Sequence, residues 1–202
     1  MILKSYIVEQ DLNILNKYQA FLLYGENDGI KDDIKTKLKK LNKDCEIINF
    51  FETDIIKNKN ILYENIANKS LFNDKKVIFI QTATDKIFNQ IAECLERENG
   101  KTKIYIFSDI LDKKSKLRSL FEKEKNIATI PCYEDNARTL INYISIELKE
   151  IKGLTGEMIN LIISNSNSNR KIIKSEITKI KNYFIKKNIN KEDLLELLNI
   201  RN

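Results

Sequence analysis

Five short apolar segments, each separated from the next by a helical pattern, restrict the fold of this chain more than any other feature. They are rich in β-branched and aromatic residues and cover 20–24, 45–50, 76–81, 103–107 and 127–132. The helical patterns between them cover 30–41, 60–68, 86–98 and 113–122. Strands of about five residues that alternate with helices of about ten predict βαβ units and a parallel sheet.

Two of these segments, 77–80 and 104–107, are apolar without alternation, which is typical of strands that helices cover on both faces. Asp85 and Asp112 precede the last two helical patterns, and acidic residues at such positions favour the start of a helix. The expected fold is therefore an α/β domain with a parallel five-stranded sheet flanked by helices.

After Cys132 the pattern contains helices only, and this change indicates a second domain. Its expected helices cover 136–150, 156–163, 170–187 and 191–198. Thr155 and Asn190 stand where helix N-caps are expected. We therefore place the α/β domain at 1–137 and a small all-helical domain at 138–202.

The 202-residue chain contains no histidine, and this absence excludes several kinds of catalytic site. Ser-His and Cys-His nucleophiles, histidine-ligated metals and the usual general base near neutral pH are all ruled out. The three cysteines are far apart and offer no CxxC metal pair. We therefore expect no catalytic residue, no metal and no cofactor in this chain, and no enzyme activity of its own.

The composition also bears on location and partners. No apolar run approaches the roughly 20 residues that span a membrane, and the first residues lack the charged-then-apolar order of a signal peptide. We therefore expect a cytoplasmic protein that makes no membrane contact. The formal net charge is +6, and most of the basic residues are lysines. Such a charge fits either a solvated lysine-rich surface or a surface that faces DNA.

The stretch 21–29 has the strand–loop–helix setting of a phosphate-binding P-loop but lacks the residues that bind nucleotide. The motif requires a second glycine followed by lysine and Ser/Thr, whereas Gly29 is followed by Ile30-Lys31-Asp32. Carboxylates that would repel a phosphate are present at Glu26, Asp28 and Asp32. We expect no nucleotide hydrolysis at this degenerate P-loop, which consists of Gly25, Glu26, Asn27, Asp28 and Gly29.

Two large apolar residues, Leu71 and Phe72, follow Ser70 in an otherwise polar stretch before the segment at 76–81. They are either a core anchor that closes the preceding helix or an exposed wedge that binds a partner protein. An exposed Leu-Phe pair inserted into a pocket would form a small binding hot spot. Both interpretations stay open on these residues alone.

Basic residues cluster where the fourth strand meets its helix, at Lys113, Lys114, Lys116 and Arg118. Nucleotide-binding sheets place their ligands outside the carboxyl ends of the strands, and this cluster is expected at that edge. It is a candidate contact for phosphate or DNA. The alternative is an ordinary solvated helix start.

The order of these features resembles the delta subunit family of bacterial DNA polymerase III, the clamp-loader subunit that opens the sliding clamp. The matching stretches are 21–26, 70–72 with 76–80, 113–117, 130–133 and 176–180. They run from about residue 18 to the C-terminus, and the ordered set carries the resemblance rather than any single stretch.

The resemblance implies an AAA+-like α/β domain without ATP hydrolysis, followed by a helical lid domain. It also implies that Leu71 and Phe72, next to Ser70, form an apolar wedge that binds a hydrophobic pocket on the sliding clamp, the beta subunit. Binding would favour a clamp conformation strained toward opening, through differential affinity and without covalent chemistry. The implied partners are the clamp, the other clamp-loader subunits and, indirectly, primed DNA, within the DNA polymerase III holoenzyme.

Several differences limit which family members the chain resembles. The ATPase subunits of the loader need an intact GK[ST], and the delta-prime subunit carries a Ser-Arg-Cys motif, which Ser115-Lys116-Leu117 does not match. Delta subunits are longer, and their C-terminal collar domain is absent from these 202 residues. The alternatives to a clamp-opening subunit are a divergent nucleotide-binding AAA+ or P-loop ATPase and a DNA-binding module.

Overall fold

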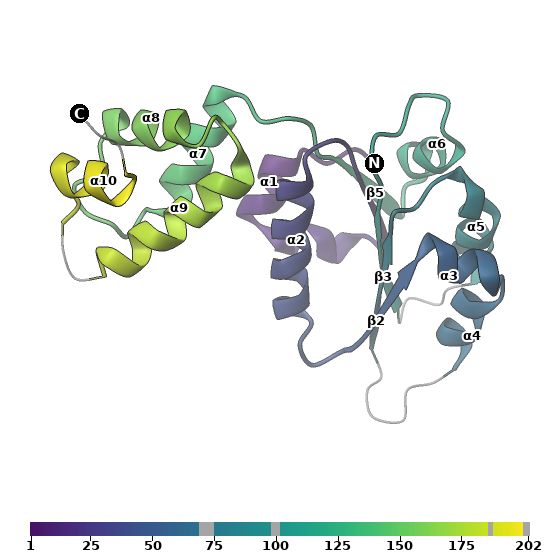
Figure 1. Ribbon diagram of the computed structural model, residues 1–202. Helices are drawn as coiled ribbons and strands as arrows, with labels where there is room; N and C mark the ends of the chain where they lie inside the picture. The colour runs from purple at the N-terminus through teal and green to yellow at the C-terminus, as the bar shows by residue number, and fades with distance from the viewer. Residues whose placement is uncertain (69–74, 98–101, 186–187, 200–202) are drawn as a thin grey trace. The chain divides into compact units, whose positions relative to one another are not determined.

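The computed structural model describes residues 1–68, 75–97, 102–185 and 188–199 (Figure 1). Contacts between residues divide the chain into two compact units, Met1–Tyr133 and Glu134–Asn202. The residues expected to form the wedge, Ser70, Leu71 and Phe72, lie outside the described residues.

The first unit is built on a sheet of five parallel strands in the order β2-β3-β4-β1-β5. The strands are β1 (Ala20–Tyr24), β2 (Glu46–Phe51), β3 (Lys76–Gln81), β4 (Thr102–Phe107) and β5 (Ile127–Pro131). The predicted α/β fold with a parallel five-stranded sheet is therefore confirmed. Every strand boundary falls within one residue of the boundary expected from the sequence.

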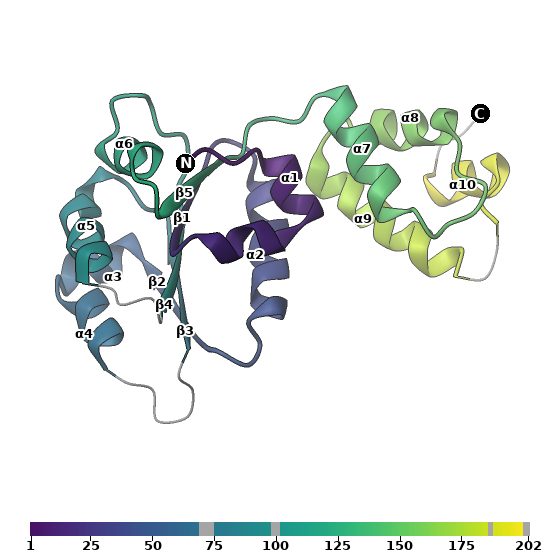
Figure 2. The same ribbon diagram turned by 180° about the vertical axis from the view of Figure 1, so that it is seen from behind.

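The strand order determines which face of the sheet each helix covers. The connection from β1 to β2 crosses the sheet in one direction, and every later connection crosses it in the opposite direction. Right-handed crossovers therefore require α2 (Asp28–Leu41) on one face and the later helices on the other. Figures 1 and 2 show this arrangement, with α1 (Ser5–Gln10) beside α2. The opposite face carries α3 (Glu52–Lys57), α4 (Ile61–Ala67), α5 (Phe88–Arg97) and α6 (Lys116–Lys123).

Alternate residues of the strands supply two separate cores. Phe21 and its neighbours face α1 and α2, and the stacked rings of Phe21 and Tyr105 have centroids 5.0 Å apart. Leu22 and Ile78 face the opposite side, where they are buried with Phe121 of α6. Burial on both faces explains why these strands show apolar residues without alternation.

The sequence reading missed some short elements and misplaced one helix start. It did not predict α1, α3 or the 3₁₀ helix η1 (Leu12–Lys17). It was also wrong in starting a helix at 113, since α6 begins at Lys116. The Asp112 carboxylate instead accepts a hydrogen bond from the Lys114 N–H at 2.7 Å, and this bond forms a turn ahead of the helix.

The second unit is all-helical in its described residues. It consists of α7 (Ala137–Glu147), α8 (Gly156–Asn165), α9 (Arg170–Tyr183) and α10 (Lys191–Leu197), packed around buried isoleucine and leucine side chains. Thr155 and Asn190 act as N-caps as expected, since their side chains accept hydrogen bonds from the N–H groups of Met158 and Asp193. None of the helices in the described ranges of the chain is long and apolar enough to cross a bilayer.

A buried ion pair links the start of α9 to the segment before α7. Arg170 Nη1 lies 3.1 Å from both carboxylate oxygens of Asp135, and each side chain is only 5% exposed. The guanidinium also lies over the ring of Tyr143, 3.9 Å from its centroid. Removing one partner of such a pair leaves the other charge buried without compensation.

We expect the substitution Asp135→Asn to lower the free energy of unfolding of the helical unit by about 3 kcal/mol. Urea denaturation followed by circular dichroism measures this change. Glu157→Gln is the matched control, because Glu157 pairs with Lys191 while both side chains are at least half exposed, and its effect should stay below about 1 kcal/mol. Equal effects of the two substitutions would contradict the assignment.

Candidate functional site

The topology of the sheet indicates where a ligand would bind. Ligands of open α/β sheets bind outside the carboxyl ends of the strands, where the helices that follow two neighbouring strands leave to opposite faces. Here that point lies between β1 and β4, because α2 follows β1 on one face and α6 follows β4 on the other. The loop 25–29 follows β1, while Ser108 and Asp109 follow β4, so the structure brings these residues together.

The loop after β1 is fastened to its neighbours through backbone hydrogen bonds. The Gly25 N–H donates to the Asp109 carbonyl at 3.2 Å, and the Asn27 N–H donates to the Cys132 carbonyl at 3.0 Å. Gly25 has a φ of +130°, and a Cβ at this position would lie 2.2 Å from the Cys132 carbonyl oxygen. Glycine is therefore required at position 25 both by its backbone conformation and by the close approach of the segment after β5.

The Lys31 side chain occupies the crevice, which is the position between the carboxyl ends of β1 and β4. Its ammonium donates to the Gly25 carbonyl at 2.8 Å and to the Ser108 carbonyl at 3.0 Å. The same nitrogen lies 2.9 Å from Asp28 Oδ1 and 3.6 Å from Asp109 Oδ1, and Lys31 is only 6% exposed. An ammonium has three donors, so two carbonyls and one carboxylate satisfy it.

The sequence reading overlooked Lys31, although a signal for it was present. Lys31 follows Gly25 by six positions, which is the spacing between the first glycine and the lysine of the P-loop motif. Counted from Gly25, Ile30 replaces the second glycine and Asp32 replaces the Ser/Thr. The lysine of the motif is thus present, but it binds the chain's own carbonyl and carboxylate groups.

The residues at the start of α2 also disfavour the binding of an anion. Phosphate binds at helix N-termini because backbone N–H groups there lack intrahelical partners. In this helix the Asn27 side chain accepts a hydrogen bond from the Ile30 N–H at 3.1 Å, and Asp28 places a carboxylate in the first turn. The crevice therefore holds a buried cation surrounded by acidic groups, an arrangement that disfavours the binding of a triphosphate.

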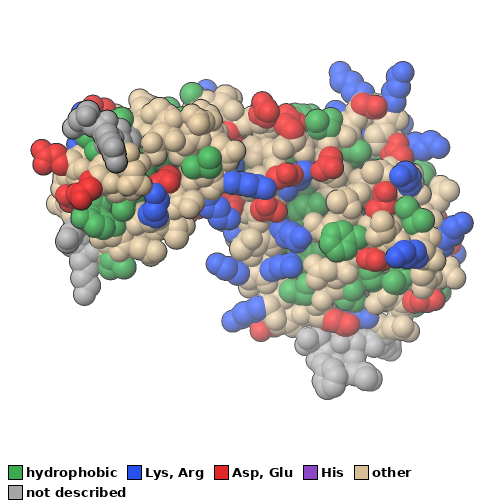
Figure 3. All heavy atoms as spheres, in the orientation of Figure 1, with side chains coloured by type: hydrophobic (Ala, Val, Ile, Leu, Met, Phe, Trp, Pro, Cys, Tyr) green, Lys and Arg blue, Asp and Glu red, His purple; other side chains and the backbone are tan. Residues whose placement is uncertain are grey.

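The basic cluster near α6 divides into two groups in the structure. Lys113, Lys114 and Lys116 are exposed, and Figure 3 shows basic side chains projecting beside α6. Arg118 instead lies over the ring of Tyr24, 4.9 Å from its centroid, and its Nε donates to Glu122 at 2.8 Å. This hydrogen bond is the main cause of the raised pKa of Arg118. The contacts of Arg118 within the chain support a structural role.

Asp85 holds the start of α6 from a different part of the chain. Its carboxylate accepts hydrogen bonds from Ser115 Oγ at 2.7 Å and from the N–H groups of Lys116 and Leu117, each at 2.9 Å. Burial raises the pKa of Asp85, but the hydrogen bonds outweigh it and hold the pKa below its ordinary value. The 3₁₀ helix η2 (Asp85–Ile87) does begin at Asp85, as expected, but the Asp85 side chain does not cap it. Thr84 accepts from the Lys86 N–H there, at 3.3 Å.

A second buried lysine anchors the chain on both sides of the segment 69–74. Lys76, the first residue of β3, is 8% exposed, and its ammonium donates to the carbonyls of Asn65, at 2.8 Å, and Asn68. Glu46 Oε2 of β2 lies 3.7 Å from the same nitrogen. A cation at the C-terminal end of α4 is favourable because the last carbonyls of a helix lack intrahelical partners. Lys76 therefore ties the end of α4 to the start of β3.

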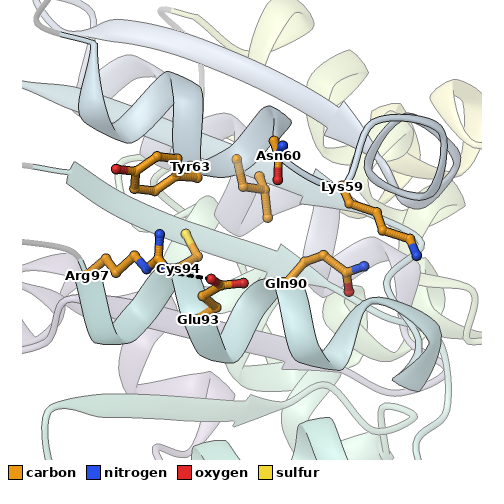
Figure 4. A pocket seen from close by; sticks show the side chains of 8 residues that line it. Lys59, Asn60, Tyr63, Gln90, Glu93, Cys94 and Arg97 are labelled. Carbon is orange, nitrogen blue, oxygen red and sulfur yellow. Dashed lines mark ion pairs between the residues drawn. The ribbon is translucent and has the colours of Figure 1, made fainter.

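A small hollow between α4 and α5 shows no catalytic arrangement (Figure 4). In it the Arg97 guanidinium lies over the ring of Tyr63, 4.8 Å from its centroid, and pairs with Glu93 at 2.5 Å. Within the described ranges of the chain, no group of three or more His, Cys, Asp or Glu side chains could hold a metal ion.

We expect the substitution Lys31→Met to lower the free energy of unfolding by about 2–4 kcal/mol, because it leaves the buried carbonyls of Gly25 and Ser108 without the ammonium. Urea denaturation measures the change. Lys40→Met, at an exposed position of the same helix, is the control and should shift stability by less than about 0.5 kcal/mol. A Lys31 variant as stable as this control would contradict the role of Lys31.

We expect Asp85→Asn to destabilise the protein at neutral pH by about 1 kcal/mol through the weakened start of α6. Because the folded-state pKa of Asp85 is lowered, the ionised carboxylate stabilises the fold above its ordinary pKa of 3.8. That stability is lost as pH falls through the folded-state pKa. The difference between wild type and variant in urea denaturation should therefore be constant from about pH 7 to 5 and shrink below about pH 4. A difference that stays the same at low pH would rule out this role.

Comparisons with protein-family models and with curated proteins give no match for this chain. Among solved structures, the Bacillus subtilis DNA clamp loader delta protein, YqeN, is similar over 98% of this chain, with a TM-score of 0.71 and 15% sequence identity. This chain spans 63% of the length of that protein. Domain III of the Thermotoga maritima replication initiation protein DnaA aligns with 96% of this chain and 88% of its own length, at a TM-score of 0.49 and 16% identity. The α/β sheet and helical unit of this chain therefore share the fold of a clamp loader delta protein.

Proposed function

We propose that this protein is a clamp-loader delta-type subunit that binds and opens a sliding clamp without hydrolysing ATP. The observation that carries the proposal is the crevice between β1 and β4, where the Lys31 ammonium is bound by the Gly25 and Ser108 carbonyls and faces Asp28. A nucleotide would have to displace these contacts and approach the carboxylate. The fold shared with the B. subtilis delta protein supports the same assignment.

The clamp-binding site in this proposal is the wedge of Leu71 and Phe72, preceded by Ser70. Its support comes from the sequence resemblance and from the anchoring of both flanks, since Lys76 holds the Asn65 and Asn68 carbonyls beside the start of β3. Anchored flanks reduce the conformational entropy lost when a segment binds a partner. Burial of two large apolar side chains contributes roughly 3–6 kcal/mol before association costs are subtracted.

Clamp opening in this proposal requires no chemical step. A clamp that binds the wedge more tightly when one of its interfaces is strained is shifted toward the open conformation by that difference in affinity. A cycle of ATP binding and release would come from other subunits of the loader. Their contacts with this chain, and any contact with primed DNA, belong to the same proposal.

One observation favours the alternative function of a divergent nucleotide-binding ATPase. Lys31 has the spacing from Gly25 that the P-loop lysine requires, so release of its ammonium from the Gly25 and Ser108 carbonyls would place a cation near a phosphate. Isothermal titration calorimetry with ATP and Mg²⁺ separates the two functions. Saturable binding would support the ATPase, and we expect none.

The clamp-binding proposal is tested with the 202-residue chain and the sliding clamp of the same organism in surface plasmon resonance. We expect the wild type to bind and Leu71→Ala/Phe72→Ala to weaken binding at least tenfold, mainly through faster dissociation. Ile110→Ala/Tyr133→Ala is the matched control, because both side chains are at least half exposed. Absence of wild-type binding, or equal binding by the wedge variant, would refute the proposal.

A further inference from the structure

Each of the five strands has a lysine within three residues of its first residue, so the amino edge of the sheet carries a row of positive charges. In the spatial order β2-β3-β4-β1-β5, these amino-edge lysines are Lys43, Lys75, Lys103, Lys17 and Lys125. Four of them are exposed and Lys103 is half-buried. Neighbouring strands lie about 4.8 Å apart, so the row extends over roughly 20 Å. The sequence places these lysines far apart, and only the strand order brings them together.

Two members of the row are close enough to affect each other. The pKa of Lys103 is lowered, first by burial and then by the positive charge of Lys75 on the neighbouring strand. The Lys103 ammonium is held at this edge by the Leu15 carbonyl at 3.2 Å. The two lysines therefore contribute to one local positive field rather than to separate surfaces.

The opposite edge of the same sheet is richer in carboxylates. The loops that follow the carboxyl ends of the strands carry acidic residues, among them Glu26, Asp28, Asp85, Asp109 and Asp112. In most nucleotide-binding sheets an anion binds at that edge. Here the carboxyl edge carries these carboxylates together with Lys86 and the lysines before and at the start of α6, and the amino-edge lysines lie at the edge that does not bind nucleotide.

The amino edge is also the edge to which the predicted wedge is connected. Asn68 and Lys75 flank the segment 69–74, and Lys76 binds the Asn68 carbonyl while it begins β3. In the proposed function, a partner that binds the wedge would therefore approach the edge where Asn68 and Lys75 lie. Protein interfaces commonly have an apolar centre and a polar rim. The charges of the rim change the rate at which the two proteins associate.

We propose that the amino-edge lysines form a basic rim that receives an acidic face of the sliding clamp around the pocket for the wedge. This inference rests on the proposed function and adds the charge of the partner surface to it. Asp44 and Glu124 lie among the lysines, so the edge carries both signs of charge. A mixed pattern matches a protein face better than the uniformly negative backbone of a nucleic acid.

The test compares two triple variants of equal charge change in the 202-residue chain. Lys17→Glu/Lys43→Glu/Lys75→Glu alters the amino edge, and Lys113→Glu/Lys114→Glu/Lys116→Glu alters exposed lysines at the carboxyl edge. Association and dissociation rates with the cognate clamp are measured by surface plasmon resonance from about 50 to 500 mM NaCl, a range over which screening removes most surface electrostatics. Circular dichroism and thermal melting confirm that both variants fold.

We expect the amino-edge variant to associate at least tenfold more slowly than wild type at low salt, with dissociation changed less than about twofold and the difference removed at high salt. The carboxyl-edge variant should associate at a rate close to wild type. Equal association rates and salt dependence for the two variants would overturn the basic rim. If Leu71→Ala/Phe72→Ala still weakened binding in that case, the proposed function would stand.

Two further outcomes would overturn the proposal in different ways. If the wild type does not bind the clamp, the proposed function fails and the basic rim fails with it. A short DNA duplex is the second probe in the same salt series. If the wild type binds the duplex and the amino-edge variant does not, while both bind the clamp at equal rates, the lysines bind a phosphodiester backbone instead.

Discussion

The handedness of the strand connections determines the position of almost every feature of the α/β unit. β1 lies between β4 and β5, so the connection to β2 and all later connections cross the sheet in opposite directions. Right-handed crossovers then place α2 on the face of the sheet opposite to α3, α4, α5 and α6. The same constraint creates the crevice between β1 and β4 and separates the carboxyl edge from the amino edge. A binding site at either edge is a consequence of that strand order.

Two buried lysines stabilise these two edges by the same physical means. Lys31 at the carboxyl edge binds the Gly25 and Ser108 carbonyls, and Lys76 at the amino edge binds the carbonyls of Asn65 and Asn68. In each case a carboxylate lies within 4 Å of the ammonium. Buried carbonyls that lack partners are costly, and a lysine side chain is long enough to reach several at once. At both edges, therefore, a lysine side chain rather than a bound ligand holds the neighbouring backbone segments together.

The sequence predicted those parts of the structure that depend on local pattern. Continuous apolar segments such as 77–80 identified the buried strands, and Thr155 and Asn190 identified helix starts through their own side chains. Contacts between distant residues were missed. Asp85 caps a helix that begins 31 residues later, and no local pattern shows this. Lys31 has the P-loop spacing only from Gly25 and not from Gly29, and its carbonyl partner Ser108 lies 77 residues away.

The buried ammonium of Lys31 has a consequence for how the protein responds to its surroundings. The stability of a domain that binds a ligand rises with the logarithm of the ligand concentration once the ligand is in excess. Such a domain becomes less stable when the ligand is scarce. Lys31 is covalently part of the chain and cannot dissociate, so the contribution it makes between β1 and β4 does not depend on the concentration of a ligand. This crevice would keep the same geometry in a cell depleted of nucleotides as in a growing one. If the proposed function holds, this chain would be the component of fixed geometry in an assembly whose other components change state.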